Sequence, residues 1–207
     1  QKEGGYPLIP LSSNLEALTV ISSGFDFELP KEEDFTKENA TLCGLKELSI
    51  FQNKVTGPLP EWKNNCSIES LNLAVNNLHG NVSIVLSTLK NLKKLYLFYN
   101  PLVGGNLPDI DLPNLRCLDI RGTGISGKIP SRYFNLTMLL LPAQYLNFTN
   151  LGPKHKCTKE VDKPTVLYVQ EESSYFDNYD KIDKRYVRCI KKGEELEWKS
   201  ACIDTYT

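Results

Sequence analysis

The segment LKELSIFQNKVTGPLP at residues 45–60 recurs, with substitutions, three more times along the chain. The later versions are IESLNLAVNNLHGNVS at 68–83, LKKLYLFYNPLVGGNLP at 92–108 and LRCLDIRGTGISGKIP at 115–130. Their first residues are 23, 24 and 23 residues apart. A period in the twenties that carries the frame L-x-x-L-x-L-x-x-N-x-L is typical of stacked repeats, so the chain is predicted to be built from similar coils laid side by side.

Each repeat begins with a short stretch of alternating apolar residues. Alternate side chains of a β-strand point to opposite faces, so positions four and six of each repeat are expected to face one core. These positions hold Leu48 and Ile50, Leu71 and Leu73, Leu95 and Leu97, and Leu118 and Ile120. One coil cannot bury this face alone, whereas neighbouring coils stacked against each other build a continuous core.

Two further positions recur in phase and are predicted to be structural. The ninth position holds Asn53, Asn76 and Asn100, whose side-chain amides can bond backbone groups of adjacent coils. Thr123 takes this position in the fourth repeat, which predicts a weaker ladder there. The thirteenth position is glycine, which tolerates backbone angles that other residues avoid. These glycines are Gly57, Gly80, Gly104 and Gly127.

The repeats resemble leucine-rich repeats of the kind common in plant receptors, which are marked by the second half L-x-G-x-(I/L)-P. Three repeats carry this half, at Gly57–Pro60, at Gly104 with Leu107 and Pro108, and at Gly127–Pro130. The resemblance implies a leucine-rich-repeat solenoid with a short parallel β-sheet on its concave face and turns and 3-10 segments on its convex face. Degenerate repeats extend it at residues 15–30 and at Met138, in phase at 23 residues, where Pro142 is expected to end the strand early. The solenoid is expected to span residues 1–152 with about six rungs.

Residues 153–207 differ in composition from the repeats and are rich in lysine, glutamate and tyrosine. The segment YVRCIKKGEELEWKSAC reads as two strands around a Lys-Gly-Glu turn. We therefore predict that these residues form a small, β-rich, disulfide-bonded C-terminal cap module on the solenoid.

The cysteines predict one disulfide directly and leave the others open. Cys43 and Cys66 lie one repeat apart, and equivalent positions on adjacent rungs are about 5 Å apart, so we expect these two to be bonded. The simplest scheme for the rest closes the cap with two of its three cysteines and joins the third to Cys117, which lies on the exposed side of its strand. Otherwise Cys117 is a free thiol or an intermolecular link. The cap cysteines are Cys157, Cys189 and Cys202.

Sequons and an even number of cysteines together predict a secreted or cell-surface glycoprotein. The chain has six cysteines. Its formal net charge is -1, and a charge this close to zero gives no reason to expect a nucleic-acid partner. It lacks a run of about 18 apolar residues, so no transmembrane segment is expected in it. N-linked glycans are expected at the Asn-x-Ser/Thr sequons. The sequon asparagines are Asn39, Asn65, Asn81, Asn135 and Asn147.

A binding surface is expected on the face of the sheet formed by positions three, five and seven of each repeat, which we call the outward face. Phe51 and Phe98 flank Ala74 there, with Tyr96 and Arg121 beside them, which predicts an exposed aromatic patch. Aromatic residues and arginine contribute most to interface energies. The alternative is that these side chains only cover the sheet and contact the cap. The candidate partner-binding residues are Phe51, Asn72, Ala74, Lys94, Tyr96, Phe98, Asp119 and Arg121.

Two other kinds of site were considered. Tyr175 and Tyr179 lie among acidic residues and are candidates for tyrosine sulfation in a secreted protein, the alternative being a solvated loop. For catalysis, His79 and His155 lie in a predicted turn and a linker, and the sequence has no nucleophile elbow, zinc spacing or P-loop. We therefore expect no enzyme activity, no metal and no cofactor.

Three functions fit these features. The preferred one is a non-catalytic extracellular glycoprotein that binds a protein ligand or receptor through the concave face of the solenoid. The second is a structural subunit of an extracellular matrix, coat or filament that self-associates. The third follows from the resemblance to plant repeat proteins that block cell-wall enzymes, and is an inhibitor of secreted hydrolases.

Overall fold

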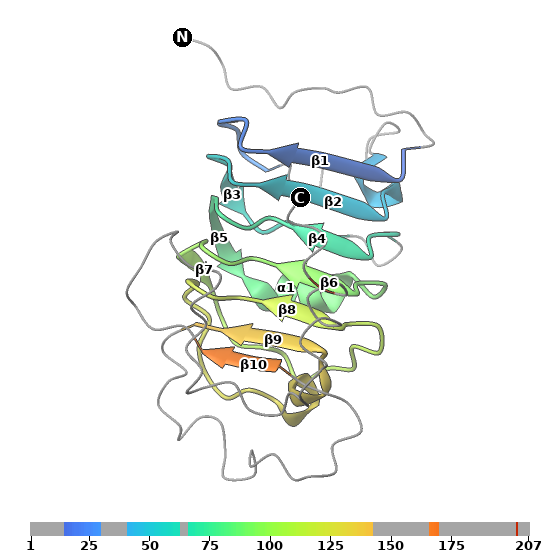
Figure 1. Ribbon diagram of the computed structural model, residues 1–207, viewed down its shortest axis with the longest axis vertical. Coiled ribbons are helices and arrows are strands. Elements are labelled where there is room, and N and C mark those ends of the chain that lie inside the picture. The colour runs from blue at the N-terminus through green and yellow to red at the C-terminus, as the bar shows by residue number, and fades with distance from the viewer. Residues whose placement is uncertain (1–14, 30–40, 63–65, 143–165, 170–201, 203–207) are drawn as a thin grey trace, which may run out of the picture.

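Parallel strands stacked one below another form the main sheet of the structure (Figure 1). The computed structural model describes residues 15–29, 41–62, 66–142, 166–169 and 202. Within these residues seven strands pair in the order β1-β2-β4-β6-β8-β9-β10, so each repeat places its strand beside that of the preceding repeat. The strands are β1 (Ala17–Ile21), β2 (Glu47–Phe51), β4 (Ser70–Asn72), β6 (Lys94–Tyr96), β8 (Cys117–Asp119), β9 (Met138–Leu141) and β10 (Val166–Val169).

The second half of each central repeat contributes to a smaller parallel sheet, where the sequence predicts turns and 3-10 segments. Its strands pair in the order β3-β5-β7, because backbone groups left free by the turn find partners in the next coil. The Leu59 N–H, for example, donates to the His79 carbonyl at 2.8 Å. These strands are β3 (Thr56–Pro58), β5 (Asn77–Asn81) and β7 (Leu102–Gly104).

Short helices complete three of the coils. The 3-10 helices η2 (Thr41–Gly44) and η3 (Ser131–Asn135) agree with the expected type, whereas α1 (Val82–Thr88) is an α-helix where turns were expected. It forms because the Asn81 side chain accepts a hydrogen bond from the Ser83 N–H at its start, and because Val82, Val85 and Leu86 bury one helical face.

The inward positions of the repeats form one apolar core, as predicted. All eight leucines and isoleucines expected at positions four and six are buried, with relative exposures of 0% to 3%. The repeat-start residues Leu45, Ile68, Leu92 and Leu115 join the same cluster, as do the α1 residues. The core therefore runs continuously from coil to coil along the stack.

Asparagines at the ninth position tie each coil to its neighbour, which confirms the predicted ladder. Asn76 donates to the Ile50 carbonyl at 2.7 Å, and its oxygen accepts from the Val55 N–H at 3.1 Å. Asn53 and Asn100 make the same kinds of contact in their rungs. The Thr123 hydroxyl donates to Ile120, within its own coil, at 2.6 Å. A threonine hydroxyl has one donor hydrogen, whereas an asparagine amide has two beside its acceptor oxygen, so threonine bonds fewer backbone groups.

The turn after each strand needs a left-handed residue that the sequence did not reveal. Position eight has a positive φ in all five rungs where it is described, at Ser22, Gln52, Val75, Tyr99 and Gly122. At position thirteen the prediction is wrong for the third repeat. This repeat is one residue longer, and Gly105 rather than Gly104 takes the positive φ, at 87°.

The last repeat pairs in a register different from the predicted one. Cys117 pairs with Met138 and Leu118 with Leu139, so Met138 occupies position three and the repeat begins at Leu136, not at Met138. This shift places the ladder position of the last repeat outside the described residues. β9 ends at Leu141, directly before Pro142, but it is not cut short, because its four residues exceed the three of β4, β6 and β8.

Little of the predicted cap falls within the described residues. Residues 166–169 form β10, which pairs in parallel with β9 and so continues the main sheet. Cys202 is the other described residue of that region. Apart from Cys202, the predicted hairpin lies outside the described residues.

Candidate binding surface on the outward face

Register brings the predicted outward-facing residues into columns on adjacent strands. Position five forms one such column, in which residues on adjacent strands are paired from Ser49 through Asn72, Tyr96 and Asp119 to Leu140. Position three forms another, from Glu47 through Ser70, Lys94 and Cys117 to Met138. The sequence therefore places these side chains on one face of the main sheet, and the pairing confirms that they are neighbours.

The predicted aromatic residues form a real cluster. The rings of Phe51 and Phe98 lie 6.0 Å apart, centroid to centroid, and the Tyr99 ring lies 5.7 Å from that of Phe98. The Arg121 guanidinium sits 5.5 Å above the Phe98 ring, within the range of a cation–π contact. Asp119 fixes it there, because the two carboxylate oxygens accept hydrogen bonds from the guanidinium at 2.9 and 2.6 Å.

The cluster is not exposed as predicted. Tyr96 is 0% exposed, Phe98 2% and Ala74 0%, and Asn72 and Asp119 are buried as well. Phe51, Lys94 and Arg121 keep partial exposure. The burial arises because this face carries a second apolar cluster, separate from the core inside the coils. Its buried members are Ala74, Tyr96, Phe98, Cys117, Met138, Leu140 and Cys202.

Cys202 is covalently attached to the outward face. It forms a disulfide with Cys117, with a Cα–Cα distance of 5.9 Å, which confirms the expected link between Cys117 and a cysteine of the C-terminal region. The hydroxyl of Tyr96 donates a hydrogen bond to the main-chain carbonyl of Cys202. The outward face therefore already contacts polypeptide main chain. The alternative considered from the sequence, in which the patch contacts the C-terminal region, describes this contact better than an open patch does.

Two polar side-chain atoms on this face have no hydrogen-bond partner within the described part of the chain. They are the Ser49 hydroxyl oxygen and the Asn72 amide nitrogen, both buried. The orientation of the Asn72 amide is set by its oxygen, which accepts from the Ala74 N–H at 3.1 Å. Because Ser49 and Asn72 are paired on β2 and β4, the two unpaired atoms belong to adjacent strands. Such a pair can bind an amide group of another polypeptide.

Sequence reasoning missed Met138 and Leu140 as members of this cluster because it placed the last repeat two residues too late. One signal was available. Residues 138–141 read MLLL, and every residue of β9 is buried. A strand without alternation is typical of a sheet covered on both faces, so this run indicated that the outward face is covered at that end.

The other confirmed disulfide joins Cys43 to Cys66, with a Cα–Cα distance of 4.4 Å. It lies outside the outward-face cluster, and Cys66 belongs to the core inside the coils. Cys157 and Cys189 lie outside the described residues.

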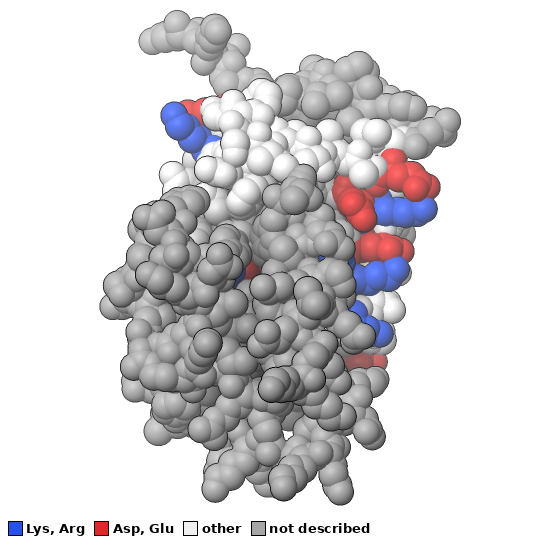
Figure 2. All heavy atoms as spheres, viewed as in Figure 1, with Lys and Arg blue, Asp and Glu red and all other residues white. Residues whose placement is uncertain are grey.

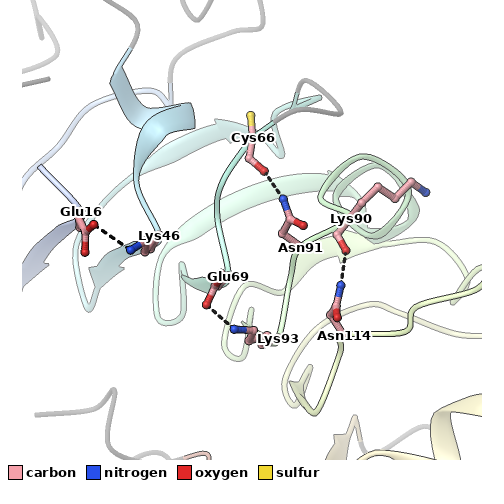
Figure 3. Close-up of polar contacts among 8 residues, drawn as sticks. All are labelled: Glu16, Lys46, Cys66, Glu69, Lys90, Asn91, Lys93 and Asn114. Atoms are coloured by element: carbon pink, nitrogen blue, oxygen red, sulfur yellow. Dashed lines mark hydrogen bonds and ion pairs between the residues drawn. The ribbon is translucent and has the colours of Figure 1, made fainter. Parts of the chain in front are cut away.

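Charged residues occupy position two of the repeats that contain β1, β2, β4, β6 and β8, directly before each of these strands of the main sheet begins. Lys46 pairs with Glu16 at 2.8 Å and Lys93 with Glu69 at 2.6 Å (Figure 3). The hydrogen bond to Glu16 and the charge of that carboxylate raise the pKa of Lys46 above its usual value. Charged side chains of both signs also gather along one side of the molecule in Figure 2. Exposed pairs of this kind stabilise a fold little, so we read them as a solvated edge.

Amide side chains also join neighbouring coils on this side of the structure. Asn91 donates to the Cys66 carbonyl and Asn114 to the Lys90 carbonyl, each at 3.1 Å (Figure 3). These contacts repeat from coil to coil and hold the turns before the strands in register.

Two of the predicted sequons fall within the described residues. Asn81 is exposed at the start of α1, and Asn135 ends η3. The other three sequon asparagines, Asn39, Asn65 and Asn147, lie outside the described residues, as do the candidate sulfation sites Tyr175 and Tyr179.

None of the helices in the described residues has the length and apolar character needed to cross a bilayer. No group of three or more histidine, cysteine, aspartate or glutamate side chains there is placed to hold a metal ion.

Comparison with known sequences supports the repeat assignment. The Leucine Rich Repeat family model matches residues 114–136, which cover the fourth repeat. Receptor-like protein 18 of Arabidopsis thaliana is 32% identical over 99 residues, which is 47% of this chain. The match covers 12% of that relative, so the chain corresponds to a small part of its length.

Three solved structures match parts of this chain. A pollen receptor kinase 3 structure is 24% identical, has a TM-score of 0.51 and is matched over 62% of each chain. The BIR2 ectodomain from Arabidopsis thaliana is 22% identical with a TM-score of 0.47, matched over 56% of this chain and 59% of that one. The plant peptide hormone receptor RGFR1, solved in complex with RGF2, is 29% identical with a TM-score of 0.49, over 64% of this chain and 24% of that one.

The first of these structures supports the fold, and the sequence matches support the type of repeat. Together with the in-phase frame, the parallel main sheet and the asparagine ladder, they identify the repeats. The repeats of this chain are similar to leucine-rich repeats, and their sequence is similar to that of a plant receptor-like protein.

Proposed function

We propose that this chain is a non-catalytic extracellular glycoprotein that binds a peptide or protein partner through the outward face of its leucine-rich-repeat solenoid. The observation that carries the proposal is the hydrogen bond from the Tyr96 hydroxyl to the main-chain carbonyl of Cys202. A main-chain carbonyl is present in every polypeptide, so a face that binds one beside aromatic rings has the chemistry to bind a partner chain.

The accessible part of this face suits such a partner. Phe51 and Arg121 are partly exposed at the edge of the aromatic cluster, and Lys94 is partly exposed on β6. Aromatic and arginine side chains contribute most to binding when surrounding contacts exclude water. Asp119 holds the Arg121 guanidinium in place, so less conformational entropy is lost when a partner binds there.

Three observations support an extracellular location. Two disulfides lie in the described residues, and disulfides persist in oxidising compartments. Asn81, in one of the five sequons, is exposed. The relative at 32% identity is named a receptor-like protein. Because the chain matches 12% of that relative, receptor activity of a larger protein is part of the proposal.

We also infer that the solenoid spans residues 1–152 and that residues 153–207 form its C-terminal cap. The pairing of β10 with β9 supports a close attachment, because a strand from the cap region extends the sheet of the solenoid. The Cys117–Cys202 disulfide adds a second connection on the outward face.

The test is a selection of a random peptide display library on the immobilised, oxidised wild-type chain. Selected peptides are then titrated against wild type, Phe51→Ala and Lys94→Glu, with Arg132→Glu in η3 as control. We expect each outward-face substitution to raise Kd at least about tenfold, or 1.4 kcal/mol, and the control to leave Kd unchanged. Phe98 is unsuitable because it is buried, so its substitution would perturb the fold. If no peptide is enriched, or if both substitutions leave Kd unchanged, the proposal fails.

A further inference from the structure

Cys202 occupies the aromatic part of the outward face in the manner of a bound peptide. Its side chain is bonded to Cys117, its carbonyl accepts from Tyr96, and it is 0% exposed within the second apolar cluster. These contacts come from two strands, β6 and β8, that are neighbours in the main sheet. Cys202 thus satisfies both a polar and an apolar requirement of the site.

The fit of this occupant is incomplete. The Ser49 hydroxyl and the Asn72 amide nitrogen are buried on the same face, in the same column as Tyr96, and lack a hydrogen-bond partner within the described part of the chain. A buried polar atom without a partner destabilises the arrangement that buries it. A polypeptide that bonded Ser49 and Asn72 as well as Tyr96 would therefore match this face better than Cys202 does.

We propose that Tyr96, Phe98, Asn72 and Ser49 line a polypeptide-binding subsite that the chain's own Cys202 fills, with the Cys117–Cys202 disulfide keeping it filled. An occupant joined covalently is present at a much higher effective concentration than a free peptide. In the oxidised chain a partner is then limited to the accessible margin at Phe51 and Lys94. This last consequence rests on the proposed function, whereas the occupancy itself does not.

The direct test measures whether Tyr96 is accessible. Wild type and the double variant Cys117→Ser/Cys202→Ser are treated with tetranitromethane, and nitration is located by mass spectrometry of peptides. Tyr133 is the internal control, because it is buried in the core inside the coils and not on the outward face. Cys43→Ser/Cys66→Ser is the matched variant, since it removes the disulfide that lies outside the outward-face cluster.

We expect Tyr96 nitration to rise at least tenfold in Cys117→Ser/Cys202→Ser, with Tyr133 unchanged, and neither tyrosine to react in wild type or in Cys43→Ser/Cys66→Ser. The proposal is overturned if Tyr96 stays protected without its disulfide, because Cys202 is then not what fills the subsite. It is equally overturned if Tyr133 reacts together with Tyr96, or if the matched variant also exposes Tyr96, because the contact is then part of the folding core.

A second measurement tests what the opened subsite binds. A synthetic peptide of residues 196–207 with Cys202→Ser is added to the Cys117→Ser/Cys202→Ser chain before nitration, with a scrambled peptide as control. We expect the native-order peptide, and not the scrambled one, to restore Tyr96 protection at least fivefold. Equal effects of the two peptides would overturn the assignment as a polypeptide subsite. Neither result depends on Phe51 or Lys94, so failure here is distinguishable from failure of the proposed function.

Discussion

The side-chain amide of Asn76 donates a 2.7 Å hydrogen bond to the main-chain carbonyl of Ile50, which lies in the preceding coil. The same amide donates to the Leu73 carbonyl in its own coil and accepts from the Val55 N–H. One side chain therefore satisfies backbone groups of two coils at the point where the strands end and the ladder of the main sheet stops.

Replacing Asn76 with alanine should leave these buried backbone groups without partners. Each such group costs about 1–3 kcal/mol, and partial relaxation leads us to expect a total loss of about 3 kcal/mol in the free energy of unfolding. Thr123→Ala, at the same position of the fourth repeat, should cost about 1 kcal/mol, because its hydroxyl bonds within one coil. Guanidinium unfolding with intact disulfides measures both, and equal losses would contradict the ladder's role.

The continuous core predicts a contrast between two leucines of the same repeat. Leu95 is 0% exposed on β6, and Leu102 is 67% exposed on β7. Leu95→Ala should lower the free energy of unfolding by about 2–5 kcal/mol, through lost apolar burial and the cavity left behind. Leu102→Ala should change it by less than about 0.5 kcal/mol. Denaturant unfolding of both variants is the measurement, and a small loss for Leu95→Ala would show that the coils collapse around the gap.

Asn81 has two predicted roles, as the cap of α1 and as a glycosylation site, and different substitutions should affect them separately. Its side-chain oxygen accepts a 2.9 Å hydrogen bond from the Ser83 N–H, while a glycan would be attached to its nitrogen. Asn81→Asp should lose the glycan and keep the cap, because aspartate is an equally good cap residue. Ser83→Ala should likewise lose only the glycan. Asn81→Ala should lose both and cost about 1 kcal/mol of stability.

Material from a secretory eukaryotic host, compared by intact mass and then by thermal unfolding after enzymatic deglycosylation, tests this. If the intact mass of the wild type shows no glycan, the prediction that Asn81 is glycosylated is wrong. An Asn81→Asp variant as unstable as Asn81→Ala would show that the cap contributes little.

The parts of this structure that the sequence predicted are those set by the repeat itself. The inward positions, the asparagine ladder and the Cys43–Cys66 disulfide follow from spacing, because each involves residues one period apart. The second sheet was missed because its strands carry turn residues, such as Gly57 in β3, and are held only by pairing between coils.

Burial of the outward face could not be predicted in the same way. One contact on that face joins Tyr96 to Cys202, which is 106 residues away in sequence and lies in a region without repeats. Position within a repeat fixes which face a side chain joins, but it carries no information about what covers that face. The run of apolar residues in β9 was the local sign that something does.

Tyr133 predicts how stability changes at alkaline pH. Its hydroxyl donates to the Pro108 carbonyl at 3.0 Å, and burial raises the pKa of this phenol above its usual value of about 10. The folded state therefore holds the phenol proton more tightly than the unfolded chain does. This contribution to stability is fully present below about pH 10 and is lost as the pH rises further towards the folded-state pKa, because the unfolded chain releases the proton first.

We expect Tyr133→Phe to be about 1 kcal/mol less stable than wild type at pH 7, through the lost hydrogen bond, and to lose less stability than wild type between pH 9 and pH 11. Urea unfolding at a series of pH values measures the two slopes. All residues other than Tyr133 are common to the two proteins, so their contribution cancels in the difference between the curves. If the unfolding free energies of the two proteins change in parallel with pH, the Tyr133 phenol ionises alike in the folded and unfolded states. Burial would then not raise its pKa.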